Sequence, residues 1–168
     1  MDLMLLEELF DYKNELMKTL CSNKAIMELM TDDPKVTVPN HQMAYKKIFP
    51  FEYIPDTVDK GDTFICYDVD IIDVENKTYL YPAIYVWIFT HKSKLRLPQG
   101  GARLDSIAVE INKELNGSRY FGLGELCLKR CDRFVPIDDY QGRCLVYHAK
   151  DFNNTSPSKK APINRRNR

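Results

Sequence analysis

The sequence predicts an α+β domain: a small, mostly antiparallel sheet of two hairpins with two to three helices packed on it. Apolar residues recur at helical spacing near the N-terminus and again over 104–115. Two adjacent runs, 62–73 and 79–90, are rich in β-branched and aromatic residues, and a glycine-containing segment leads to two more extended runs. The order helix–helix–hairpin–helix–hairpin indicates one domain over 1–152 and a flexible, polar and basic arm over 153–168.

Two helices are expected at the start of the chain. The first covers residues 2–20, because its apolar residues form one stripe: Leu6, Leu9, Phe10, Met17 and Leu20. Ser22 is a suitable N-cap for a second, short helix, whose apolar residues are Ile26, Leu29 and Met30. The sequence Asp32-Asp33-Pro34 ends this helix, because the residue before a proline disfavours helical backbone.

Residues 34–60 are expected to form a long, proline-rich loop. Loops of this length in compact domains are usually functional or interfacial. The loop carries four apolar residues that could pack on the domain itself or into a partner: Phe49, Phe51, Tyr53 and Ile54. Both interpretations remain open from the sequence.

The strongest strand signals are 62–73 and 79–90, which form a hairpin with a turn at 74–77. Period-two alternation places Tyr81, Ala83, Tyr85, Trp87 and Phe89 on one face of the second strand, and Ile84, Val86 and Ile88 on the other. Both faces are apolar, so helices cover one and something else, such as a neighbouring subunit, covers the other. The candidate inter-subunit apolar surface consists of Phe49, Phe51, Tyr53, Tyr85 and Trp87.

The loop 91–103 is basic and contains two adjacent glycines. Its cations are Lys92, Lys94, Arg96 and Arg103. They are either a solvated cluster or a candidate contact to DNA phosphates in a lumen or to acidic residues of a neighbouring subunit.

The last folded third begins with a helix over 104–115, with Leu104, Ile107, Ala108, Ile111 and Leu115 at core spacing. Gly117 suits the left-handed position after the helix. Strands follow near 125–134 and 143–150, joined by a turn at 138–142. The arm beyond is a candidate docking segment through Lys159, Lys160, Arg165 and Arg166.

Composition is ordinary for a soluble globular protein, with 24 basic and 24 acidic residues. Because the charges balance, contact with DNA requires a local patch. Asp2, Glu7 and Glu8 interrupt the opening apolar run, which argues against a secretory leader. The longest near-apolar run, 79–90, is too short for a membrane helix. A soluble protein that is not exported and does not bind membrane is therefore expected.

The five cysteines, an odd number, indicate reduced thiols. Cys127 and Cys131 are four apart on a predicted strand, so they are expected to share a face as buried structural residues. There is no CxxC pair, and His41, His91 and His148 lie on different elements. No catalytic residues, metal ligands or cofactor are assigned.

One enzymatic alternative concerns Asp68, Asp70, Glu75 and Lys77. Metal-dependent nucleases place an Asp on one strand and Glu-x-Lys on the next, so that carboxylates hold Mg²⁺. Here Glu75 and Lys77 fall in a predicted turn, where charged residues are common. The segment Gly122-Leu123-Gly124 is a flexible connection and not a phosphate loop, because it follows a helix and precedes a strand.

A family resemblance comes from the C-terminal third. Its residues are Asp105, Ile107 and Ile111, then LNGS at 115–118, FGLGEL at 121–126, YQGR at 140–143, Tyr147 and DFN at 151–153. In this pattern the chain resembles tail-terminator and tail-completion proteins of tailed bacteriophages, which are head-tail connector proteins of the neck. The likeness is specific over about 50 residues and loose over the preceding hairpin.

The resemblance implies a small α/β fold and a structural role without turnover. It implies a homo-oligomeric ring, usually six-fold, in the virion neck, made in the bacterial host cytoplasm. That ring terminates the tail tube and meets the head-closure protein, and genomic DNA passes through its lumen without sequence-specific contacts. A non-ring assembly factor or adaptor is the alternative.

Overall fold

The computed structural model describes residues 3–54 and 61–153, and the side chains from residue 8 onward. Its elements are α1 (Leu3–Ser22), α2 (Lys24–Thr31), η1 (His41–Met43), β1 (Ile48–Phe49), β2 (Thr63–Glu75), β3 (Tyr79–His91), η2 (Lys92–Lys94), α3 (Arg103–Leu115), β4 (Leu123–Phe134) and β5 (Tyr140–Phe152). The predicted α+β class and the order of helices and hairpins are confirmed. Within these described ranges no helix is long and apolar enough to cross a membrane.

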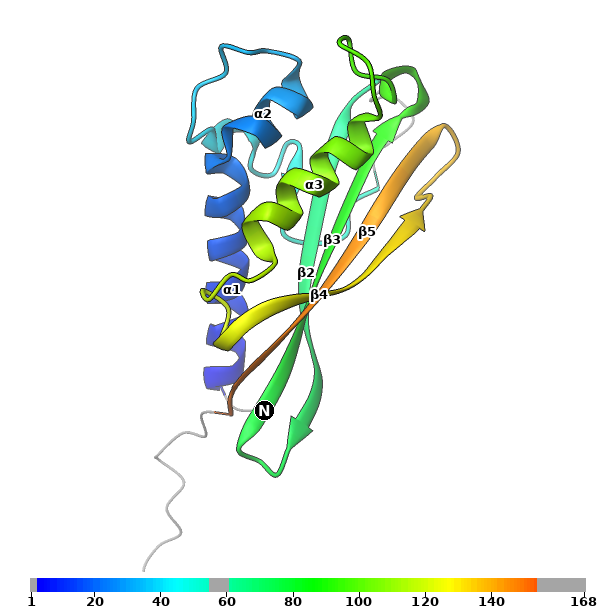
Figure 1. Cartoon of the computed structure of the whole chain (residues 1–168). Coiled ribbons are helices and arrows are strands. Elements are labelled where there is room, and N and C mark those ends of the chain that lie inside the picture. Colours follow the sequence, from blue (N-terminus) through cyan, green and yellow to red (C-terminus); the bar gives the residue numbers. More distant parts are fainter. Residues whose placement is uncertain (1–2, 55–60, 154–168) are drawn as a thin grey trace, which may run out of the picture.

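The five strands form one sheet in the order β1-β2-β3-β5-β4. Among the described strands, β1 and β2 pair in parallel, and the two hairpins join through antiparallel pairing of β3 with β5. Figure 1 shows a strongly twisted sheet with all three helices on the same face. The sheet therefore has one helix-covered face and a second face without helices.

The main core lies between the helices and the sheet. It contains Leu16 and Leu20 of α1, Ile26 and Met27 of α2, Ile107 and Ile111 of α3, and Ile65, Tyr67, Ile84, Val86, Leu145 and Tyr147 of the strands. The five residues expected to be buried on α3 are all buried, which confirms the helical spacing read from the sequence. Phe10, which was placed on the apolar stripe of α1, is instead 65% exposed, because Tyr12 and Leu16 face the core.

The junction between α1 and α2 corrects one expectation. Ser22 is the last residue of α1, and Asn23 is the N-cap of α2: its side chain accepts a hydrogen bond from the Ile26 amide at 2.9 Å. The expected stop of α2 is confirmed, since Asp32 is its C-cap with a left-handed φ of 55°.

The first hairpin has its turn one residue later than expected. Thr78 N donates to Glu75 O at 3.0 Å, and Asn76 and Lys77 both have positive φ. Two successive left-handed residues form the type I′ geometry whose twist matches that of the flanking strands. Glu75 therefore belongs to β2, and Lys77 to the turn.

The strands of the second hairpin are longer than expected, and Gly142 lies within β5 instead of in the turn. A Cβ at this position would meet Ile88 O at 2.5 Å and crowd the Cβ of Phe89 and the ring of Phe134. Glycine therefore permits the close approach of Phe89 and Phe134, whose ring centroids are 6.2 Å apart. Gly117, with φ of 86°, has the left-handed conformation expected after α3.

Cys127 and Cys131 do not share a face, contrary to expectation. Cys127 is opposite His148 and Cys131 is opposite Leu145, because the register shifts between Leu128 and Arg130. One extra residue in a strand inverts the inward–outward alternation beyond it. Both thiols are exposed instead of buried, whereas Cys21 and Cys66 are buried.

The end of β5 is anchored to α1 and to the first hairpin. The Tyr12 hydroxyl donates to the carboxylate of Asp151, and Phe152 stacks on Tyr79 at 5.6 Å. Asn153 N donates to Thr78 O at 2.8 Å. The described chain therefore ends beside the tip of the β2–β3 hairpin.

Candidate functional site

The second face of the sheet is covered at one end by the chain's own loop. Ile48 and Phe49 are consecutive in β1, so Ile48 enters the main core and Phe49 enters a second aromatic cluster on the opposite face. Phe49 stacks on Tyr53 with ring centroids 4.0 Å apart, and both contact Phe64. Of the two interpretations of this loop, packing on its own domain holds for Phe49 and Tyr53.

The loop wraps around the edge of β2. Lys13 of α1 pairs with Asp68 at 2.5 Å and donates to Pro50 O at 3.2 Å. Of the four apolar residues named for this loop, Phe51 and Ile54 project outward, at 43% and 50% exposed. Of the five residues of the expected inter-subunit apolar surface, Phe49 is buried within the chain, Tyr53, Tyr85 and Trp87 are half-buried, and Phe51 is exposed.

Beyond the loop, the second face continues as a strip on β3 and β5 whose residues are half-buried, apart from Val146, which is buried. Tyr85 and Trp87 stack with centroids 5.8 Å apart and an interplanar angle of 12°. Tyr85 is opposite Asp68 and Val146, and Trp87 is opposite Cys66 and Cys144. We call Tyr85, Trp87, Cys144, Val146 and His148 the open strip. Each described helix packs on the other face, so the open strip has no helical cover (Figure 1).

The two margins of the sheet have opposite charge. The free part of β2 carries Asp68, Asp70, Asp73 and Glu75, whereas β4 carries Lys129, Arg130 and Arg133 beside Glu125 and Asp132. Some of these charges are paired within the chain: Glu75 with Lys150 at 3.7 Å and Arg130 with Asp132 at 3.4 Å. The acidic margin and the mainly basic margin lie on opposite sides of the open strip.

Burial alters the titration of the groups in and near the open strip. Desolvation raises the pKa of the Cys66 thiol to about 12 and that of Cys144 to about 11. Burial, together with the charges of Lys129 and Arg130, lowers the pKa of His148 below its ordinary 6.5. Both shifts within the strip, at Cys144 and His148, favour the uncharged form of the side chain.

The basic loop does not present four cations together. Lys92 pairs with Asp139 at 2.5 Å and Lys94 with Asp62 at 3.8 Å, while Arg96 is exposed. Arg103 is only 2% exposed. Its guanidinium donates to Leu29 O, to Lys94 O at 2.8 Å and to Asp32 at 2.9 Å. Arg103 thus fixes α2 to the loop before α3 and is not part of a surface cluster.

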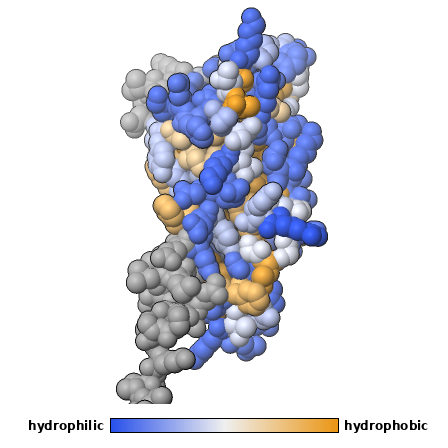
Figure 2. Space-filling model, turned by 90° about the vertical axis from the view of Figure 1, so that its left-hand side faces the viewer, coloured by the Kyte–Doolittle hydropathy of each residue, from blue (hydrophilic) through white to orange (hydrophobic). Residues whose placement is uncertain are grey.

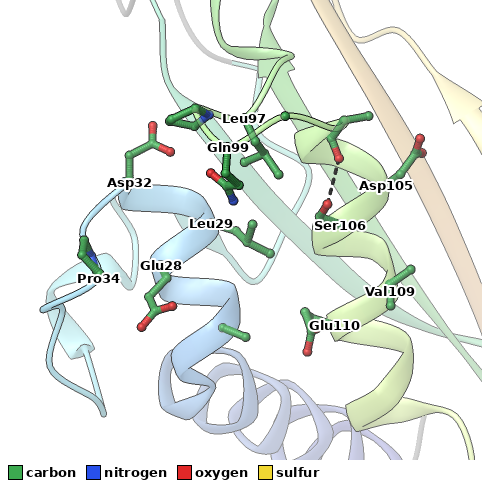
Figure 3. Close-up of a pocket in the computed structure, with 14 residues that line it drawn as sticks. Glu28, Leu29, Asp32, Pro34, Leu97, Gln99, Asp105, Ser106, Val109 and Glu110 are labelled. Atoms are coloured by element: carbon green, nitrogen blue, oxygen red, sulfur yellow. Dashed lines mark hydrogen bonds between the residues drawn. The ribbon is translucent and has the colours of Figure 1, made fainter.

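A groove between α2 and α3 was not anticipated from the sequence. Figure 3 shows Leu29 of α2 and Glu110 of α3 pointing into the space between the two helices, with Leu97 and Gln99 at one end, whereas Glu28 projects from the side of α2 turned away from α3. The Ser106 hydroxyl donates to Ala102 O at 3.0 Å, so it is satisfied within the helix. The residue of the sequence that could have indicated this groove is Val109, because it is apolar but lies on the otherwise polar side of α3. Val109 is 52% exposed.

The residues of the nuclease alternative do not form a metal centre. Asp68 is paired with Lys13, and Glu75 accepts a hydrogen bond from the Tyr81 hydroxyl at 2.5 Å. Across the described ranges, no group of three or more His, Cys, Asp or Glu side chains is placed to hold a metal ion. The candidate docking residues Lys159, Lys160, Arg165 and Arg166 lie outside the described residues.

Comparison with known proteins identifies the family. The YomW family model matches residues 13–149, which include all three helices in whole or part and both hairpins. The chain belongs to the YomW family. This YomW family member has no match among curated proteins. A solved chain from the virion of a native gene transfer agent particle is 17% identical, with a TM-score of 0.42, over 64% of this chain and 79% of that one.

Proposed function

We propose that the chain is a structural virion protein that forms a ring in the neck of a phage-like particle, where it terminates the tail tube and joins it to the head-closure complex. The open strip carries the proposal. A sheet face bearing a stacked Tyr85–Trp87 pair and no helical cover suits burial against another subunit. The C-terminal pattern shared with tail-terminator proteins supports the same role.

The charge difference between the sheet margins supports a ring. A cyclic ring of identical subunits needs a heterologous interface, in which two different surfaces of each subunit meet. The acidic margin at Asp70 and Asp73 and the basic margin at Lys129 and Arg133 are such a pair, because each attracts the other and repels itself. Burial of the open strip between subunits stabilises the interface by about 25 cal/mol for each Å² of apolar surface removed from water.

The side of the molecule that carries α1 and the basic loop are both compatible with a structural role without catalysis. Figure 2 shows the side on which α1 lies: it is mainly hydrophilic, with separate small hydrophobic patches. We assign that side to solvent and the open strip to the subunit interface. Within the lumen, Lys92 and Arg96 are exposed cations of the basic loop, and Lys92 and Lys94 are partly neutralised by Asp139 and Asp62. DNA would therefore pass with weak, sequence-independent contacts and without turnover.

Light scattering of the purified chain, with negative-stain images of the same fractions, tests the proposal. Closed rings, alone or on tail tubes, are the expected result. The variant Tyr85→Lys should lose them, because it places a charge in the open strip, whereas Tyr120→Lys, at a tyrosine 77% exposed outside the strip, should keep them. A chain that stays monomeric with every neck partner would favour the adaptor alternative. Mg²⁺-dependent cleavage lost in Asp70→Ala would favour the nuclease.

A further inference from the structure

The outer edge of β2 is covered by another strand at its beginning and is free towards its end. β1 pairs with β2 at Ile65 and Cys66, where Ile65 N also donates to Lys47 O at 2.9 Å. Figure 1 shows the other end of β2 projecting together with β3 beyond the helices. Among the described residues, no strand pairs with the outer side of 69–75. This stretch is therefore a free edge of the sheet.

The outer amides of this free edge are satisfied by side chains of the same strand. Successive N–H groups of a strand alternate between its two sides, so Val69 N points to the same outer side as Ile65 N. Val69 N donates to the carboxylate of Asp68, and Val74 N donates to that of Asp73, each at 2.8 Å. Such local hydrogen bonds compete with the ladder of a sheet, so a neighbouring strand can replace them.

The outer edge of β4 is also covered first and free afterwards. Leu126 N donates to Ser118 O at 2.8 Å, and Leu128 N donates to Oδ1 of Asn116 at 3.0 Å. Within residues 3–54 and 61–153, the outer side of 129–134 has no such partner. The sheet thus has a second free edge, of similar length, on its opposite side.

The two free edges carry unpaired charges of opposite sign. Asp70 and Asp73 on β2 are exposed, and no Lys or Arg in the described part of the chain forms an ion pair with either. Lys129 and Arg133 on β4 are likewise exposed and have no Asp or Glu partner in those ranges. The charges that would attract a second strand are therefore not neutralised within the subunit.

These charges favour one of the three pairings that two free edges allow. Pairing of β2 with β2 of another copy would bring Asp70 and Asp73 against the same residues, and pairing of β4 with β4 would do so for Lys129 and Arg133. Pairing of β2 with β4 brings opposite charges together. Both edges also carry a bulge, a feature that hinders indiscriminate edge pairing. The favoured contact is heterologous, as a closed ring requires.

The strand directions make this contact antiparallel. Each neighbouring pair in the order β2-β3-β5-β4 is antiparallel, so β2 and β4 run in opposite directions. A neighbouring copy whose strands keep the same sense therefore presents its β4 antiparallel to β2. Antiparallel pairing is slightly more stable per residue than parallel pairing.

We infer that residues 69–75 of β2 in one subunit pair with residues 129–134 of β4 in the next, so that the sheet continues from subunit to subunit. The inference rests on the proposed ring, because the ring supplies the neighbour. Main-chain hydrogen bonds give such added strands their affinity. The Val69 and Val74 amides exchange the carboxylates of Asp68 and Asp73 for carbonyls of the neighbour. The pairing uses the edges of the sheet and leaves its faces free for the contact proposed for the open strip.

Hydrogen exchange of the full chain, measured by mass spectrometry on assembled and monomeric fractions, tests the pairing. We expect the outer amides of 69–75 and 129–134 to exchange at least about tenfold more slowly in assemblies, because a strand ladder protects them. Closed rings in which both segments exchange as in the monomer overturn the inference and leave the proposed function intact. Protection of both segments in open chains of subunits supports the pairing and contradicts the ring. A chain that never associates overturns both.

Charge reversal tests which edges meet. Asp70→Lys with Asp73→Lys makes both edges basic, and Lys129→Glu with Arg133→Glu makes both acidic. Each variant alone should assemble about tenfold more weakly than the unchanged chain. Mixing the two should restore assemblies that contain equal numbers of each in native mass spectrometry, because every acidic edge then meets a basic one. Undiminished assembly of either variant alone, or a mixture of folded variants that does not assemble, overturns the inference.

The matched control changes the same charge at another surface. Asp11→Lys with Asp33→Lys alters two exposed carboxylates, on α1 and after α2, that lie outside both edges. This variant has the net charge of Asp70→Lys with Asp73→Lys and should assemble as the unchanged chain does. Equal weakening in the two variants would assign the effect to net charge and overturn the inference.

Discussion

Arg103 donates from Nη2 to the carboxylate of Asp32 at 2.9 Å, joining the first residue of α3 to the C-cap of α2. The same guanidinium donates to the carbonyls of Leu29 and Lys94. One buried cation thus fixes two helices and a loop, and it sets the separation of the walls of the groove.

Arg103→Ala should destabilise the fold by about 3 kcal/mol, because it leaves two buried carbonyls and Asp32 without their donor. Arg103→Lys should recover only part of this loss, since an ammonium cannot reproduce the fork of donors. Urea unfolding followed by circular dichroism measures both. Lys92→Ala, at an exposed pair with Asp139, is the control and should cost less than about 1 kcal/mol. Equal losses at the two positions would show that Arg103 has no special structural role.

Thiol reactivity should separate the five cysteines. In the native monomer, Cys127 and Cys131 are exposed and should react quickly with Ellman's reagent. Cys21 and Cys66 should react only on unfolding, because they are buried and burial raises the pKa of each thiol. Ring assembly should protect Cys127, which is opposite His148 in the open strip, more than Cys131, which faces the helix side. Cys127→Ser and Cys131→Ser variants assign each reaction rate to its thiol. Equal protection of Cys127 and Cys131 on ring assembly would argue against the open strip as the interface.

Acidification should destabilise the chain through His148. Its pKa is lowered in the folded state, so the unfolded state binds more protons below the ordinary value of 6.5. The free energy of unfolding should therefore fall as pH decreases from 6.5 towards the folded-state pKa. His148→Gln should remove this component, whereas His41→Gln, at an exposed position on η1, should retain it. An identical pH dependence in both variants would contradict the assignment to His148.

Gly142→Ala should destabilise the sheet by about 1–3 kcal/mol, because the added methyl meets Ile88 O and cannot be relieved by a side-chain movement. Gly124→Ala is the comparison: its Cβ meets nothing within 4 Å, and only its φ of 81° opposes the change, at about 1 kcal/mol. Thermal unfolding of the Gly142→Ala and Gly124→Ala variants measures which substitution lowers the stability more. A smaller effect at Gly142 would show that β3 and β5 are not held as closely as the structure indicates.

The sequence alone predicts the helices and strands, but it does not predict how they are placed relative to one another. Helical spacing predicted the buried side of α3, because Ile107 and Ile111 follow one regular period. The bulge before Arg130 was not predicted, because one extra residue leaves no trace in the polar run 129–133. The sequence groups Arg103 with the surface cations, because no local pattern shows that Asp32, seventy-one residues earlier, lies beside it. The groove depends on how α2 and α3 are placed on the sheet, which no local pattern encodes.

The most direct test of the central proposal is the location of the chain in assembled particles. Particles purified from the cells that make the chain are labelled with gold-conjugated antibody against it and imaged by electron microscopy. The proposal predicts gold at the junction of head and tail and its loss from particles assembled with Tyr85→Lys. Particles that carry no label, or label only along the tail or on the head, would contradict a ring in the neck.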